Sequence, residues 1–173
     1  MLNVTTATLP LSELELKPQS ELAQYFSTLP SATSDQLAGR AWVGKLYAPI
    51  KVEKMPTLVR KTVATLLSAG INPWKGKAFN AEGTGANLWL WGQQFGQYTM
   101  LEQDSPVDQQ PCLWLDYNVA NNPLLLRHIR GEVRILGENQ FLARMNWLAS
   151  DQFYCVAYFS LSSPKNVSKG VTP

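Results

Sequence analysis

The feature that most constrains the fold of this chain is a succession of short alternating segments between residues 74 and 161. In each segment apolar side chains recur at every second position, and nearly every segment carries an aromatic residue. Because successive side chains on a strand point to opposite faces, this period predicts strands with one apolar face. Many such strands joined by tight turns form an antiparallel sheet that closes, or nearly closes, into a barrel. We therefore expect an all-β, mainly antiparallel protein.

The alternating segments, together with an earlier one around Trp42, define about eight strands, which is what a small closed barrel requires. Most of the connections are short and contain Gly or Asn, which tolerate the positive φ angles of tight turns. The connection between the first two strands is the longest. The expected strands cover residues 40–49, 74–79, 87–91, 95–103, 111–117, 125–136, 140–148 and 153–162.

Helices are expected only before the second strand, where one or two of them would act as a lid. Ser20 suits the N-cap of the first helix, and Pro30 marks its end. The last helix carries a single apolar stripe, which either crosses the open end of the barrel as a lid or packs against its flank. The expected helices cover residues 20–29, 34–38 and 56–70.

A chain of 173 residues is expected to form one core, because this length suits a single domain that buries most of its apolar surface. Residues 1–19 are expected to form an N-terminal arm and residues 20–162 a single barrel domain. Residues 163–173 lack an apolar period and are expected to form a flexible tail.

Composition argues against several classes of partner. The formal net charge is +2 and the basic residues are scattered, which favours neither nucleic acid nor an anionic membrane. No stretch approaches the roughly eighteen uninterrupted apolar residues of a membrane span, and residues 1–10 lack the features of a secretory signal. Cys112 and Cys155 have apolar neighbours, which suits reduced, packed thiols. We therefore expect a cytoplasmic protein with no membrane span and no nucleic-acid partner.

Alternation also predicts which side chains share the barrel interior. Between the large rings, small residues leave either an interdigitated core or a slot for a flat apolar ligand. These small residues are Gly131, Ala143, Cys155 and Ala157, and Phe153, Cys155, Ala157 and Phe159 are expected to form one stripe. The residues expected to bind a ligand there are Trp89, Trp91, Trp114, Asp116, Arg130, Phe141, Met145, Trp147 and Phe159.

A cluster of charged residues on two neighbouring strands permits two interpretations. If its face lies outside the barrel, the cluster is a ladder of ion pairs that contributes little to stability. If the face lies inside, the guanidinium groups would hold the head of a fatty-acid-like ligand. The opposite face of the same strand is the apolar one, so the ladder is favoured. The cluster comprises Arg127, Arg130, Glu132, Arg134 and Arg144.

Candidates for catalysis or for holding a cofactor are few. His128 is the only histidine, which excludes a His-rich metal site. Its arginine neighbours favour an exposed or ion-paired side chain over a ligand to haem iron. No Gly-x-Ser-x-Gly motif indicates a serine hydrolase. Asp116 and Glu102 lie among apolar neighbours, so each is either a buried acid with a raised pKa or a partner for an arginine. We expect no cofactor and no metal.

Several segments resemble small bacterial lipocalin-like proteins of unknown function. Residues 115–118 (LDYN), 122–123 (NP), 127–134 (RHIRGEVR) and 142–145 (LARM) are similar to the second half of these proteins. Residues 39–44 (GRAWVG) and 74–79 (WKGKAF) resemble the signatures of the neighbouring GXWXG and DUF4334 type domains. The resemblance extends over residues 39–161 and implies a lipocalin-like, or calycin-like, barrel without an assigned activity.

Three hypotheses about function follow. The favoured one is a protein that binds a small hydrophobic molecule inside the barrel. The second is an enzyme of the same fold, such as an isomerase or cyclase, that acts on a hydrophobic substrate through Asp116 or Glu102. The third is a filled-core interaction protein, which predicts an exposed apolar patch and a homodimer in solution.

Overall fold

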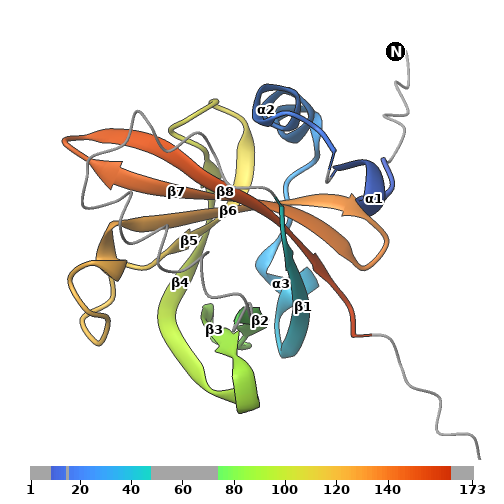
Figure 1. The fold of residues 1–173 in the computed structure, drawn as a ribbon. Helices are drawn as coiled ribbons and strands as arrows, with labels where there is room; N and C mark the ends of the chain where they lie inside the picture. The colour runs from blue at the N-terminus through green and yellow to red at the C-terminus, as the bar shows by residue number, and fades with distance from the viewer. Residues whose placement is uncertain (1–8, 15, 48–73, 165–173) are drawn as a thin grey trace, which may run out of the picture.

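The computed structural model describes residues 9–14, 16–47 and 74–164. Within them one antiparallel sheet closes into a barrel (Figure 1), because each strand pairs with the next and β8 pairs with β1. The strands are β1 (Arg40–Leu46), β2 (Trp74–Phe79), β3 (Thr84–Trp89), β4 (Gln94–Asp104), β5 (Pro111–Asp116), β6 (Ile129–Gly137), β7 (Gln140–Ala149) and β8 (Gln152–Ser162). The predicted all-β, antiparallel barrel is confirmed.

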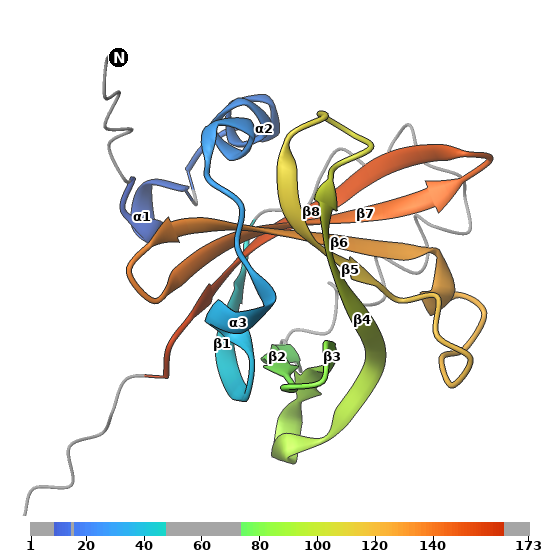
Figure 2. The ribbon, with the colours of Figure 1, turned by 180° about the vertical axis from the view of Figure 1, so that it is seen from behind.

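The helices of the described residues are short. They are α1 (Leu11–Leu14), α2 (Gln19–Thr28), α3 (Ser34–Leu37) and the 3-10 helices η2 (Leu90–Gly92) and η3 (Leu126–His128). In Figure 2 α3 lies beside β1, whereas α2 lies outside the barrel. None of these helices has the length and apolar character needed to cross a membrane. The helix expected at residues 56–70 lies outside the described residues.

Three local differences from the expected elements have physical reasons. Trp91 adopts a φ of 60° within η2, so it belongs to the turn between β3 and β4 and not to a strand. Residues 126–128 form η3, and β6 consequently begins at Ile129. Helix α2 begins one residue before Ser20, and its N-cap is Pro18, whose fixed φ of −59° leads the chain into the helix.

The barrel interior is tightly packed at one end. There Trp42 meets Phe141 edge to face, with 5.0 Å between ring centroids. The indole nitrogen of Trp42 donates a hydrogen bond to the carbonyl oxygen of Leu37 at 3.1 Å, which holds α3 against this end. The buried side chains around them include Phe79, Tyr98, Leu113, Val133 and Leu161. Large side chains therefore fill this half of the interior, and α3 covers it.

A β-bulge in β8 changes which of its side chains face inward. Met145 of β7 pairs with Ala157, but the residue after Met145 pairs with Cys155, which leaves Val156 as an extra residue. Val156 and Ala157 consequently both face the interior, whereas Cys155 packs on the outer side of the sheet. The bulge thus divides the stripe expected from the sequence, formed by Phe153, Cys155, Ala157 and Phe159.

Helix α2 covers the outer face of the sheet and forms a second apolar cluster with it. The ring of Phe26 is fully buried and lies edge-on to Tyr158 of β8, with 5.8 Å between centroids. The other buried members of this outer cluster are Leu14, Leu22, Leu29, Tyr47, Leu136 and Leu142. Helices α1 and α2 therefore pack against the barrel wall, and α2 is not a lid.

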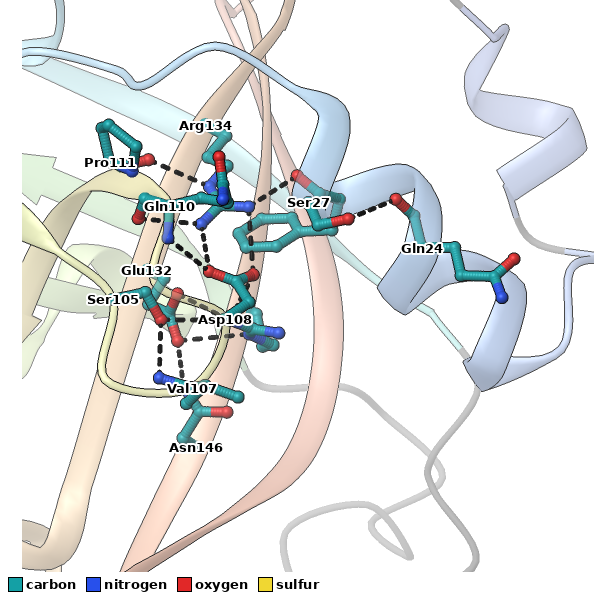
Figure 3. Close-up of polar contacts among 12 residues, drawn as sticks. Gln24, Ser27, Ser105, Val107, Asp108, Gln110, Pro111, Glu132, Arg134 and Asn146 are labelled. Atoms are coloured by element: carbon teal, nitrogen blue, oxygen red, sulfur yellow. Dashed lines mark hydrogen bonds and ion pairs between the residues drawn. The ribbon is translucent and has the colours of Figure 1, made fainter.

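Charged side chains lie beneath α2 on the same outer face (Figure 3). Glu132 and Arg144 are direct partners across β6 and β7, and the Arg144 guanidinium donates to the two oxygens of Glu132 at 3.2 and 2.8 Å. Asp108 accepts from Arg144 at 3.0 Å and from Arg134 at 2.7 and 3.1 Å. The predicted ladder of ion pairs is present on the outside of the barrel, but Glu132 and Arg134 are both 0% exposed. Because these ion pairs are buried, the loss of one partner would destabilise the fold, which is not expected of solvated pairs on the surface.

Arg134 also joins this network to the helix. Its guanidinium donates to the carbonyl oxygen of Phe26 at 2.8 Å and lies 4.4 Å above the Phe26 ring. The carbonyl belongs to the last turn of α2 and also accepts the backbone N–H of Leu29 at 3.2 Å, so Arg134 adds a second hydrogen bond at the helix end. One side chain therefore contacts the helix end, covers its anchoring ring and pairs with Asp108.

The first prediction concerns this buried network. Substitution of Glu132 by Gln is expected to destabilise the protein by about 3 kcal/mol or more, because a buried guanidinium then loses the negative charge of its carboxylate partner. Urea unfolding measures the change. The exposed Glu82, in the turn between β2 and β3, provides the control substitution Glu82→Gln, which is expected to change little. If E132Q lowered the free energy of unfolding no more than E82Q does, the buried network would not stabilise the protein as described.

Candidate functional site

The half of the barrel away from α3 contains a cavity of about 490 Å³. This volume lies within the roughly 300–1,000 Å³ that is common for small-molecule sites. Gly131 and Ala157, two of the small residues noted in the sequence, lie on its wall, whereas Ala143 lies in the packed interior. The lining residues are Leu46, Trp74, Lys77, Asn87, Trp89, Leu90, Trp91, Gln93, Phe95, Tyr117, Leu126, Ile129, Gly131, Met145, Val156, Ala157 and Phe159.

Four of the predicted ligand-binding residues line this cavity. Trp89, Met145 and Phe159 form part of its wall, and Trp91 lies at its rim, where it is 91% exposed. The indole nitrogen of Trp89 donates to the carbonyl oxygen of Phe95 at 3.1 Å, which fixes the ring at the β3–β4 turn. The apolar wall expected from these residues is therefore present.

The other predicted ligand-binding residues lie away from the cavity. Phe141 packs against Trp42 in the filled end, and Trp147, the partner of Ile129 across β6 and β7, is buried in the core but is not a lining residue. Trp114 and Asp116 lie on the outer face, because their strand neighbours Leu113 and Leu115 face inward. Arg130, the partner of Asp116 across β5 and β6, lies on the same face. The ring of Trp114 packs against Phe153 at 5.7 Å, and Arg130 pairs with Asp116 at 3.2 Å. The structure thus separates this group from the cavity wall.

The acids considered for catalysis also lie outside the cavity. Asp116 pairs with Arg130, as described above. Glu102 accepts hydrogen bonds from the backbone nitrogen and the hydroxyl of Ser34, each at 2.9 Å, and these bonds lower the pKa of its carboxyl. His128 is exposed and stacks on Trp147 at 5.3 Å. Neither acid lines the cavity, as the isomerase or cyclase hypothesis requires.

A lysine provides the polar centre of the cavity. Lys77 is only 3% exposed, and it is the one formally charged residue among the described residues that line the cavity. Its Nζ donates to Oδ1 of Asn87 at 2.7 Å and to the hydroxyl oxygen of Tyr117. The Tyr117 hydroxyl in turn donates to Asn87 Oδ1 at 3.1 Å. An amine, an amide and a phenol therefore form a closed triangle of hydrogen bonds on an otherwise apolar wall.

Irregular pairing in β2 brings Trp74 to the same side as Lys77, which alternates regularly with the inward-facing Phe79. The pairing of β2 with β3 shifts between Trp74 and Gly76, so that the intervening residue is bulged. Trp74 and Lys77, which strict alternation would place on opposite faces, consequently both reach the cavity. Gly76 permits this path, since its φ is 143° and a Cβ there would lie 1.9 Å from the carbonyl oxygen of Trp42.

The partners of Lys77 are also fixed by the sheet. Asn87 lies directly opposite Lys77 in the β2–β3 register. The pairing of β3 with β4 is irregular at Gly96, where a Cβ would lie 2.9 Å from Nδ2 of Asn87. Tyr117 follows β5 and has the same parity as the inward-facing Leu115. Residues from β2, from β3 and from just after β5 thus meet around one amine.

The surroundings of Lys77 favour its neutral form. Burial lowers the pKa of the amine from 10.5 to about 7, because a cavity wall solvates a charge poorly. The described part of the chain offers this amine no carboxylate partner. The titratable groups that face it are the phenols of Tyr98 and Tyr117, whose ring centroids lie 4.8 and 5.0 Å from Nζ. Burial raises the pKa of both phenols, so they remain neutral at physiological pH.

Sequence reasoning missed Lys77, Asn87 and Tyr117 as site residues. Lysine is almost never fully buried without a partner, so a lysine in a strand is ordinarily assigned to the solvent face. The available signal was parity: Lys77 lies two residues before Phe79, which faces the packed interior. The same parity argument connects Tyr117 with Leu113 and Leu115.

The second prediction tests the state of the buried amine. Between pH 7 and 10.5 the lysine is charged in the unfolded chain and neutral in the folded one. Raising the pH through this range therefore favours the folded state. Lys77→Met removes the titrating group, so the stability of the wild type relative to this variant is expected to rise between pH 6 and 9. The slope is at most about 1.4 kcal/mol per pH unit.

Denaturant unfolding of both proteins across this pH range measures the difference. Burial also raises the pKa of the Cys112 thiol to about 12 and that of Cys155 to about 11, but these contributions are common to both proteins and cancel. Lys75→Met on the same strand, where the side chain is exposed, serves as the control. A wild-type-minus-variant difference that stays flat from pH 6 to 9 would show that Lys77 titrates as a solvated amine.

Comparison with known proteins supports the fold. No family model matches the chain, and no curated protein matches its sequence. A solved structure, described as "Crystal structure of protein from Thermomonospora curvata", is similar with a TM-score of 0.57 and 15% identity. The similarity covers 86% of this chain and 89% of that chain. At this identity the likeness shows a shared barrel fold, and the resemblance to lipocalin-like, GXWXG and DUF4334 proteins stays a prediction.

Proposed function

We propose that the protein binds a small, largely apolar molecule in the cavity of the barrel, as lipocalin-like barrels do. The observation that carries this proposal is the combination of a cavity of about 490 Å³ with one polar centre on its wall. Binding sites of small molecules are commonly apolar with a few placed polar groups. The ligand class is accordingly an apolar body with a single polar end.

The geometry gives the ligand a direction. Trp89, Met145 and Phe159 offer apolar surface for the body of the molecule. Lys77 and its partners offer hydrogen bonds for the polar end. The exposed Trp91 and the half-exposed Phe95, at 91% and 50%, mark where the cavity approaches the surface. The polar end of the ligand is therefore expected at the lysine and its apolar end toward these two rings.

The third prediction is that apolar ligands change the fluorescence of the tryptophans on the cavity wall. Titration with decanol is expected to give a saturable change, because Trp74, Trp89 and Trp91 line the site. Native mass spectrometry then measures whether one molecule binds per chain. Absence of both signals with a panel of alcohols and fatty acids would contradict the proposal.

A cavity-filling variant locates the binding. Ala157→Leu places added side-chain volume into the space that the ligand would occupy, so the affinity for decanol is expected to fall by at least about tenfold. Ala81→Leu, in the exposed turn after β2, is the control and is expected to bind as the wild type does. Circular dichroism and unfolding of both variants show whether a lost signal reflects lost binding. Equal affinity of a folded A157L variant would place the ligand elsewhere.

A further inference from the structure

We propose that Lys77 forms a reversible imine with an aldehyde or ketone bound in the cavity. This inference rests on the proposed function and narrows its ligand class to apolar carbonyl compounds. It is carried by the position of the amine on the cavity wall and by the way in which its hydrogen bonds are arranged.

Nζ lies within hydrogen-bond reach of two acceptors, and a neutral amine can satisfy both of them. A neutral amine has two N–H donors and one lone pair, whereas an ammonium group has three donors and no lone pair. The two acceptors are Asn87 Oδ1 and the Tyr117 oxygen. The Tyr117 hydroxyl donates to Asn87. In the neutral form both N–H groups are therefore used inside the protein, and the lone pair is left for an electrophile in the cavity.

The apolar surroundings suit the reaction at this amine. A desolvated lysine in an apolar pocket is a recognised form of activated nucleophile. The pKa of about 7 leaves a large neutral fraction at physiological pH. The product imine carries less charge than an ammonium group, so the apolar wall favours it once it has formed.

The step balances without a further reactant. The lone pair of Nζ attacks the carbonyl carbon, and the carbonyl oxygen receives a proton from the nitrogen to give a carbinolamine. The hydroxyl group then leaves with a second proton as water while the nitrogen lone pair forms the C=N bond. Tyr117, which contacts both Nζ and Asn87, is placed to pass the proton between nitrogen and oxygen. No electrons are gained or lost overall.

A carboxylate ligand held as an ion pair is the rival use of the same amine. It requires the ammonium form, which burial disfavours. The carbonyl ligand is therefore the better match, and the experiment includes a carboxylate to separate the two.

The fourth prediction uses decanal as the probe, with sodium cyanoborohydride to reduce any imine to a stable secondary amine. Intact mass spectrometry at pH 7.5 is expected to show one adduct per chain, with the mass of decanal less one oxygen atom. Peptide mapping is expected to place it on Lys77, with labelling at least about tenfold faster than at any other lysine. Excess decanol, which occupies the cavity but forms no imine, is expected to suppress the labelling in the wild-type protein.

Variants separate nucleophilic from electrostatic roles. Lys77→Arg keeps a cation and hydrogen-bond donors but no nucleophilic amine, and it is expected to abolish the adduct. Lys75→Met, on the same strand with an exposed side chain, is expected to retain it. Competition by decanol requires no substitution, so the test stays decisive even if a Lys77 variant fails to fold.

Each outcome separates this inference from the function on which it rests. Decanol binding without a Lys77 adduct, or labelling spread evenly over surface lysines, would overturn the imine and leave the binding function standing. Decanoate binding that survives in K77R, with no decanal adduct on the wild type, would identify an ion-pair site and likewise overturn the imine. Failure of decanol, decanal and decanoate to bind at all would overturn both.

Discussion

Closure of the sheet through the β1–β8 pairing is the constraint on which the rest of the structure depends. In a closed barrel all inward side chains share one enclosed interior. Large side chains fill it, and small ones leave part of it empty. Trp42 and Phe141 fill one end, and α3 covers it. Gly131 and Ala157 leave the other end hollow. The site is therefore a consequence of how side-chain volume is distributed along the strands.

Alternation places the polar groups in that space, and bulges add apolar neighbours to them. Lys77, Asn87 and Tyr117 each keep the parity of an inward-facing residue two positions away. The irregular pairing in β2 brings Trp74 to the cavity, and the extra residue in β8 places Val156 on its wall. Bulges are frequent beside functional sites because they re-aim side chains that alternation would direct elsewhere.

Period two was sufficient to predict the strands and to favour an outward direction for Glu132 and Arg134, because both follow from local alternation. Arg130 has the same parity and lies outside as well, although it was also expected among the residues that bind a ligand in the interior. Period two could not predict that α2 covers charges on the outer face, since burial of that face depends on how a distant segment docks. It also misplaced Cys155, because one additional residue in a strand shifts parity without changing the local composition. Of the residues expected to bind a ligand, Trp89, Met145 and Phe159 line the cavity, whereas Trp114 lies on the outer face because its neighbours Leu113 and Leu115 occupy the inward positions.

The second apolar cluster, between α2 and the outside of the barrel, has a consequence for how this protein can diverge. Phe26, Arg134 and Glu132 hold the helix to the wall without contributing to the cavity lining. This outer cluster thus lies apart from the cavity wall. Exchanges at Trp89 or Met145 can reshape the cavity while the outer cluster and the end beneath α3 keep the barrel folded. A lineage built on this plan is free to change the shape of its cavity more readily than its architecture.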